Sequence, residues 1–140
     1  MPAALLKWIS MKPQLDTLLA EIYETDRRYR PDAYEFVLEA LSFTQKKYRR
    51  TKHVTGEELL DGIKELLMER FGPMALTVLR YWRVFATEDF GNIVFNLVEK
   101  RVLSKTEEDD IQVFRNKYDF EEVFEKGYRS QLARKISRMR

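Results

Sequence analysis

The chain has no cysteine, and it contains few of the other residues that build recognisable sites. Its 140 residues include one histidine, five glycines and four prolines. The absence of cysteine excludes a disulfide framework and a thiolate metal site, and it fits a reducing compartment. One histidine without cysteine is too few for an ordinary zinc site. The scattered glycines form no glycine-rich loop of the kind that cradles phosphate. We therefore expect no cofactor and no metal.

Long apolar runs are also missing from the sequence. No stretch approaches the roughly 20 apolar residues that a helix needs to cross a bilayer. Residues 1–10 are mildly apolar, but they are too short and too weakly cationic at their start for a good signal peptide. We interpret them as an N-terminal extension and predict a cytoplasmic protein.

Charge is abundant and unevenly distributed. Apolar residues make up 44% of the chain and charged residues 34%, which is typical of one folded domain with a large solvated helical surface. The net charge of +2 conceals separate blocks. Residues 46–53 are basic, whereas residues 106–110 and 119–122 are acidic. Residues 126–140 carry six cations and no carboxylate side chain.

Apolar residues recur at helical spacing through most of the chain. Thr55 and Glu58 have the spacing of a capping box at a helix start, and Gly72 suits the end of that helix. Thr87 is predicted to cap the helix that follows, and Trp82 to lie in the core. The expected helices cover residues 13–26, 31–49, 56–71, 73–82, 88–99 and a final stretch from residue 120.

Residues 53–120 suggest a particular fold. Arg101–Ser104 and Ile111–Arg115 have the composition of two short strands on either side of an acidic loop. Three helices followed by such a hairpin are typical of a winged-helix-like unit. The predicted fold is mainly α: two N-terminal helices packed on a winged-helix-like three-helix unit with a short β-hairpin. It forms a single domain over residues 11–125, followed by a basic C-terminal helix or tail over residues 126–140.

Several motifs in this region resemble those of a small bacterial family of conserved hypothetical proteins. They are HVTGEELL at 53–60, FGPMA at 71–75 and TEDFGNIVFNLVE at 87–99, with YEFVLEAL at 34–41, LSKTEED at 103–109 and YDF at 118–120. The resemblance covers roughly residues 20–125. It implies a bacterial protein with a single compact unit, and it supplies no activity and no catalytic residue.

No side chain stands in a recognisable catalytic pattern. His53 lies in a basic stretch before a helix cap, without an evident orienting partner, so a structural or solvated histidine is favoured over a general base. No serine has the Gly-x-Ser-x-Gly spacing of a nucleophile elbow. Glu107–Asp110 lack the spacing of a calcium loop and are interpreted as a solvated turn. We predict that the protein is not an enzyme.

Two amides and two basic segments are candidates for nucleic-acid contact. Asn92 and Asn96 lie one turn apart on the helix that would read DNA, where amides can recognise adenine. The carboxylates around them would repel phosphate, so we favour exposed or capping amides. The basic segments are better candidates for anion contact, and their residues are Lys46, Lys47, Arg49, Arg50, Lys52, Arg129, Arg134, Lys135, Arg138 and Arg140.

The sequence leaves two functional hypotheses. The first is a non-enzymatic adaptor that binds a protein or a structured RNA, for example on the ribosome, through its helical surface and basic tail. The amphipathic tail can also lie on an anionic membrane or serve only solubility. The alternative is a winged-helix DNA-binding transcriptional regulator, which the acidic third helix and loop disfavour. The oligomeric state stays open.

Overall fold

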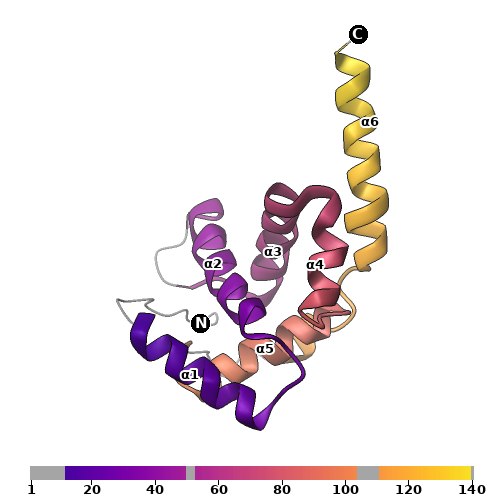
Figure 1. The fold of residues 1–140 in the computed structure, drawn as a ribbon. Helices are drawn as coiled ribbons and strands as arrows, with labels where there is room; N and C mark the ends of the chain where they lie inside the picture. The colour runs from indigo at the N-terminus through magenta and orange to yellow at the C-terminus, as the bar shows by residue number, and fades with distance from the viewer. Residues whose placement is uncertain (1–11, 50–52, 104–110, 140) are drawn as a thin grey trace.

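Helices account for most of the computed structural model, which describes residues 12–49, 53–103 and 111–139 (Figure 1). A mainly α fold, as predicted, is confirmed. Two 3₁₀ turns, Gly72–Met74 and Ile111–Phe114, and a π-helical segment, Glu121–Gly127, accompany the α-helices. The α-helices are α1 (Lys12–Thr25), α2 (Pro31–Lys47), α3 (Gly56–Phe71), α4 (Ala75–Tyr81), α5 (Thr87–Glu99) and α6 (Tyr128–Arg138).

Two sequence predictions concern the ends of the chain and the membrane. The extension predicted over residues 1–10 lies outside the described residues. Within the described ranges, no helix combines the length and the apolar character that crossing a membrane requires.

The central helix is α2, which packs against α1, α3 and α5. Its inner face carries small side chains, of which Ala33, Val37 and Ala40 are fully buried. α3 comes very close where Thr44 of α2 meets Gly62. A Cβ atom on Gly62 would lie 1.9 Å from the Thr44 hydroxyl oxygen, a distance at which atoms overlap. Glycine at this position therefore sets how closely α2 and α3 pack.

The ends of α3 follow the sequence prediction. The Glu58 amide donates to the Thr55 hydroxyl at 3.0 Å, and the Thr55 amide donates to the Glu58 carboxylate at 2.9 Å. The capping box is thus confirmed. At the other end Gly72 has a φ of +49°, which favours glycine, and ends the helix. Trp82 is buried as predicted, with its ring centroid 5.1 Å from that of Phe36.

The predicted cap of α5 is wrong. Thr87 is the first residue of the helix rather than its cap, and its hydroxyl accepts a hydrogen bond from the Lys117 amide at 3.0 Å. The capping acceptor is the Asp89 carboxylate, which accepts from the amides of Phe85 at 2.8 Å and Ala86 at 3.1 Å. The Thr87 hydroxyl instead holds the distant Lys117 segment.

The predicted β-hairpin is also wrong in the described residues. Ile111–Phe114 forms a 3₁₀ turn, and the Phe114 ring packs closely on Gly91 of α5. After α5 the chain turns at Arg101, with a φ of +60°, and the Val102 amide donates back to the Leu97 carbonyl at 2.9 Å. A short apolar run fits a strand and a helical turn equally well. In residues 111–114, packing against α5 selects the helical turn. The acidic loop lies outside the described residues.

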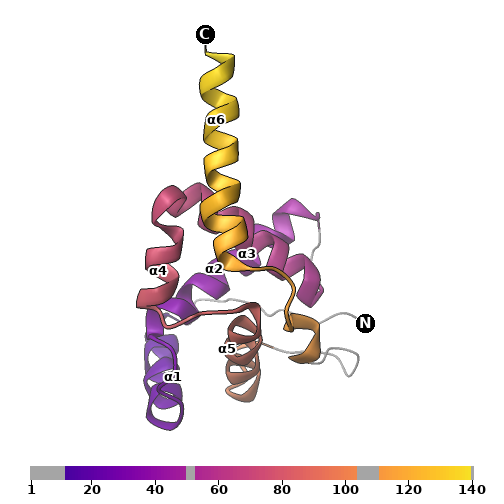
Figure 2. The ribbon, with the colours of Figure 1, turned by 90° about the vertical axis from the view of Figure 1, so that its right-hand side faces the viewer.

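The C-terminal helix projects from the rest of the molecule (Figures 1 and 2). Its base is anchored by Phe124, which is 2% exposed and packs against Tyr118 and Phe120. Tyr128 lies beside Gly72, at the end of α3. From residue 129 to residue 139 every residue is exposed. The cationic helix predicted at the C-terminus is therefore present, and most of it is exposed.

Candidate binding surfaces

One cation of the first basic segment has a structural partner. The Lys47 ammonium pairs with the carboxylates of Asp61, at 2.6 Å, and Glu65, both on α3. The Tyr48 hydroxyl donates to the same Asp61 carboxylate at 2.6 Å. These hydrogen bonds raise the pKa of Lys47 and lower the pKa of Asp61. Lys47 therefore joins α2 to α3 and is not a free cation for phosphate.

The rest of this segment divides into exposed and undescribed residues. Lys46 and Arg49 are exposed at the end of α2, and Arg49 has a φ of +54°. Arg50 and Lys52 lie outside the described residues. Lys46 and Arg49 thus remain candidate anion contacts at this place.

The second basic segment is α6 and the turn before it. Arg129 pairs with Glu125 at 3.1 Å on the exposed surface. Arg134, Lys135 and Arg138 are exposed, and no ion pair is found for them among the described residues. Arg140 lies outside this range. The cations of α6 are therefore available to a partner.

An apolar stripe runs along the same helix. Leu132, Ile136 and Met139 are 43%, 50% and 83% exposed. Their spacing of four and three residues puts them on one face of the helix. Of the cations, Arg129 and Lys135 flank this face, whereas Arg134 and Arg138 lie on the other side, so α6 is an amphipathic helix with an exposed apolar side. We call Leu132, Ile136 and Met139 the α6 stripe.

The two amides of α5 are engaged inside the protein. Asn92 donates to the Tyr29 hydroxyl at 2.9 Å. Asn96 donates to the Asp26 carboxylate and to the Tyr34 hydroxyl, both at 2.9 Å. Burial raises the pKa of both tyrosines. These bonds connect α5 to the α1–α2 turn and to α2, so neither amide is free to read a base.

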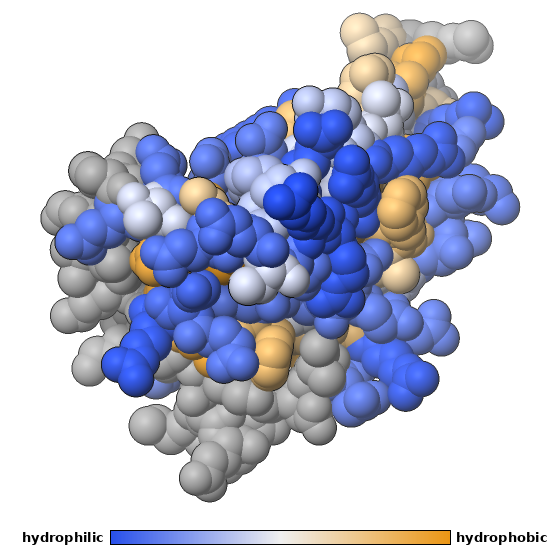
Figure 3. Space-filling view, turned by 60° about the horizontal axis from the view of Figure 1, so that its bottom comes forward, coloured by the Kyte–Doolittle hydropathy of each residue, from blue (hydrophilic) through white to orange (hydrophobic). Residues whose placement is uncertain are grey.

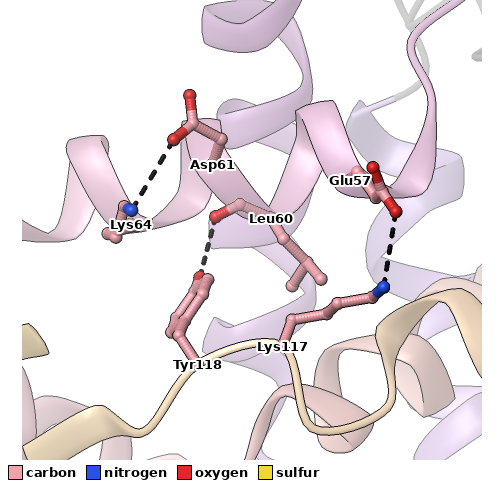
Figure 4. Close-up of a pocket in the computed structure, with 6 residues that line it drawn as sticks. All are labelled: Glu57, Leu60, Asp61, Lys64, Lys117 and Tyr118. Atoms are coloured by element: carbon pink, nitrogen blue, oxygen red, sulfur yellow. Dashed lines mark hydrogen bonds and ion pairs between the residues drawn. The ribbon is translucent and has the colours of Figure 1, made fainter. Parts of the chain in front are cut away.

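A small pocket beside α3 shows how the ionisable groups are arranged (Figure 4). Its volume is about 330 Å³. The Tyr118 hydroxyl donates to the Leu60 carbonyl at 2.7 Å, and burial raises the pKa of this tyrosine. Lys117 pairs with Glu57 at 3.3 Å. The hydroxyl and the charged groups of this pocket are thus engaged with other residues of the protein.

His53 and the carboxylates form no metal site in the described part of the chain. His53 is half-buried and lies just before the Thr55 cap. No group of three or more histidine, aspartate or glutamate side chains there is placed to hold a metal ion.

Sequence reasoning missed a third surface, at the turns α1–α2 and α4–α5. The runs DRRYR at 26–30 and RYWRVF at 80–85 interleave arginine with aromatic residues, and this pattern was the available signal. The fold brings the two runs together, because Arg30 donates through Nε to the Tyr81 carbonyl at 2.9 Å. We call Arg27, Arg30, Tyr81, Arg83 and Phe85 the arginine–aromatic surface.

Comparison with protein-family models, with curated proteins and with solved structures gave no match to this chain. The family resemblance carried by residues 53–60, 71–75 and 87–99 stays an expectation. The function is therefore inferred from the surfaces that the fold creates.

Proposed function

We propose that this protein is a non-enzymatic adaptor that binds a partner protein through α6. The observation that carries the proposal is the α6 stripe, which is exposed on a projecting helix (Figure 1) with Lys135 at its edge. Helices that expose one apolar face commonly bind by placing it in a groove of another protein. Lys135, next to the stripe, would favour a groove with an acidic rim.

Energetics favour a partner that covers the stripe. Burying a leucine, isoleucine or methionine side chain completely contributes about 1.5–3 kcal/mol, and all three residues of the α6 stripe are uncovered. An isolated helix of the length of α6, 11 residues, is only marginally stable in water. A protein groove would both bury the stripe and hold the helix in shape.

A structured RNA would explain the cations of α6 but not its apolar stripe. Phosphates would pair with the three cations, but they would leave Leu132 and Ile136 in water. A protein groove would bury the apolar side chains and could still meet Lys135 at its edge, and we therefore prefer a protein partner for this helix.

The non-enzymatic assignment is supported by the pairing of the polar groups. In the pocket of Figure 4, Tyr118 donates to a backbone carbonyl and Lys117 pairs with Glu57. A general base needs a free lone pair within reach of a substrate proton. Each of these groups is instead engaged with another residue of the protein.

The alternative of a winged-helix DNA-binding regulator has weaker support. The three-helix order of α3, α4 and α5 fits such a unit, but Asn92 and Asn96 are engaged within the protein. Residues 111–114 form a 3₁₀ turn where the second strand of the wing was expected. A duplex reader would need both features.

The test compares charge placed on the two sides of α6. Leu132→Asp and Ile136→Asp put a carboxylate on the stripe, whereas Ser130→Asp and Ser137→Asp put one on the opposite side of the same helix. Each full-length variant is used to capture partners from the native cell, with nuclease treatment. We expect a nuclease-resistant protein with the native chain and the serine variants, and its loss with the stripe variants.

Three results would contradict the proposal. Equal capture by the stripe and serine variants would show that the stripe is not the contact. Capture that disappears with nuclease would point to RNA. A doubled mass of the purified native chain, lost in Leu132→Asp, would assign the stripe to a second copy of this chain.

A further inference from the structure

The arginine–aromatic surface is built by two turns that are distant in the sequence and bonded to each other. Besides the bond from Arg30 to Tyr81, Arg83 donates through Nη1 to the Arg27 carbonyl at 3.2 Å. The buried Tyr29, which directly precedes Arg30, donates a hydrogen bond from its hydroxyl to the Asp89 carboxylate of α5. Because bonds cross between the turns at several points, the side chains of this surface have fixed relative positions.

Alternation along residues 81–85 exposes two aromatic rings. Trp82 and Val84 are 6% and 1% exposed and anchor the segment in the core. The residues between and beside them face water, with Tyr81 57% and Phe85 67% exposed. Exposed rings of this kind offer flat faces on which a base can stack. Arg83 lies between the two rings in the sequence and is exposed as well.

All of the cations at these turns are arginines. The guanidinium of Arg30 lies over the Tyr81 ring, 4.1 Å from its centroid, and that of Arg27 lies 5.5 Å from the Tyr23 centroid. Arg28 forms an ion pair with Asp26 at 2.7 Å. For Arg27, Arg30 and Arg83 no ion pair is found within the described ranges. A guanidinium both stacks on rings and binds phosphate oxygens through two parallel hydrogen bonds.

We propose that the arginine–aromatic surface binds single-stranded RNA. Tyr81 and Phe85 stack on successive bases, and Arg27, Arg30 and Arg83 hold the phosphates between and beside them. Exposed rings next to guanidinium groups are the elements with which proteins hold unpaired strands. This ligand goes beyond the protein partner proposed for α6 and uses a separate surface.

Two other ligands fit the surface less well. In a duplex the bases are stacked on each other, so Tyr81 and Phe85 would have no base face to contact. A protein partner usually meets a continuous apolar patch at the centre of its interface. The face on which α1 and α5 lie is mostly hydrophilic, and its apolar groups stand apart from one another (Figure 3). RNA, which commonly presents loops and unpaired ends, is preferred to DNA.

The test measures binding of the full-length chain to a labelled, unstructured oligoribonucleotide of about eight nucleotides by fluorescence anisotropy. We expect Tyr81→Ala and Phe85→Ala each to weaken binding about tenfold, and Tyr81→Phe to keep it, because stacking needs the ring and not the hydroxyl. Arg83→Gln should lower the slope of affinity against salt by about 0.7, the value of one phosphate contact to a single strand.

Matched controls separate this surface from the rest of the molecule. Phe95→Ala removes a ring of α5 that is 44% exposed and is not part of the arginine–aromatic surface. Arg134→Gln removes one cation from α6. Neither should change the affinity for the oligonucleotide. Photocrosslinking of the native chain provides a check without any substitution, and the crosslinked base should be found on the peptide that contains residues 81–85.

Four outcomes would overturn the proposal: no binding by the native chain, equal affinity for a duplex, equal affinity for DNA of the same sequence, or unchanged binding in both Tyr81→Ala and Phe85→Ala. Loss of binding in Arg134→Gln with retention in Arg83→Gln would move the RNA contact to α6. The adaptor proposal does not depend on this result, because its test uses Leu132 and Ile136.

Discussion

α3 and α6 are two amphipathic helices of the same chain, and they use their apolar faces differently. In α3, Ile63 and Leu67 are completely buried against neighbouring helices. In α6, Leu132 and Ile136 are about half exposed, at 43% and 50%. An apolar face at helical spacing therefore predicts that the face will be buried. It does not tell whether the same chain or a partner buries it. The face of α3 stabilises the fold, whereas that of α6 is left for a partner.

The largest expected effect comes from truncating the same residue type on the two helices. Leu67→Ala removes a completely buried side chain and should lower the free energy of unfolding by about 2–5 kcal/mol. Leu132→Ala should change it by less than about 0.5 kcal/mol, since the side chain is exposed. Urea denaturation followed by circular dichroism measures both. Equal losses would mean that α6 packs on its own chain.

A glycine-to-alanine pair should give effects of opposite sign. Gly62→Ala places a methyl group 1.9 Å from the Thr44 hydroxyl oxygen and should destabilise the protein by about 1–3 kcal/mol. In Gly127→Ala the added methyl group meets only the Glu122 carbonyl, at 3.5 Å, and alanine favours the helix by up to about 1 kcal/mol. Thermal unfolding of both variants compares the signs. A stabilised Gly62→Ala would contradict the close approach of α2 and α3.

Removing a cap should have a smaller effect. Thr55→Ala breaks the capping box at the start of α3 and should cost about 1 kcal/mol. Ser130→Ala on the exposed surface of α6 is the control and should be neutral within about 0.5 kcal/mol. Both are read from urea midpoints. A neutral Thr55→Ala would show that packing alone places the start of α3.

Acid should weaken the ion pair between Lys47 of α2 and Asp61 of α3, whereas α6 should be unchanged. The hydrogen bond from Lys47 lowers the pKa of Asp61 in the folded protein. A carboxyl group with a lowered folded pKa stabilises the fold above its unfolded pKa of about 4, and this contribution is lost as the pH falls through the folded value. Unfolding in urea at about pH 7 and about pH 3 should show the loss, and Asp61→Asn should reduce it. An identical pH dependence in Asp61→Asn would assign the loss to other carboxylates.

The sequence predicted the helices well because their signals are local. The Thr55 capping box, the glycine at residue 72 and the apolar spacing of α2 depend on residues within a few positions of each other. The cationic C-terminal helix was found for the same reason. Its projection from the body was not predicted, since it depends on the absence of a neighbour along most of its length.

The predictions that failed depend on distant partners. Thr87 has the composition of a cap, but it holds Lys117, and Asp89 caps the helix instead. Ile111–Phe114 has the composition of a strand, but it packs as a 3₁₀ turn on α5. No local pattern contains this information, because both outcomes result from contacts made after the helices have assembled.

The candidate sites divide in the same way. Charge counting found the cations of α6, which remain exposed, and also Lys47, which the fold pairs with Asp61 and Glu65. It did not join the arginines near residue 28 to the rings near residue 83, since their proximity is a property of the folded chain.

By itself, the sequence determined where helices form and which side of each is apolar, because backbone hydrogen bonding and side-chain spacing act over a few residues. It also determined the absence of cysteine chemistry and the lack of carboxylate side chains in residues 126–140. Only the tertiary structure decided which charges are neutralised, which apolar face stays open and which aromatic rings meet arginines. Those properties depend on which distant residues burial brings into contact.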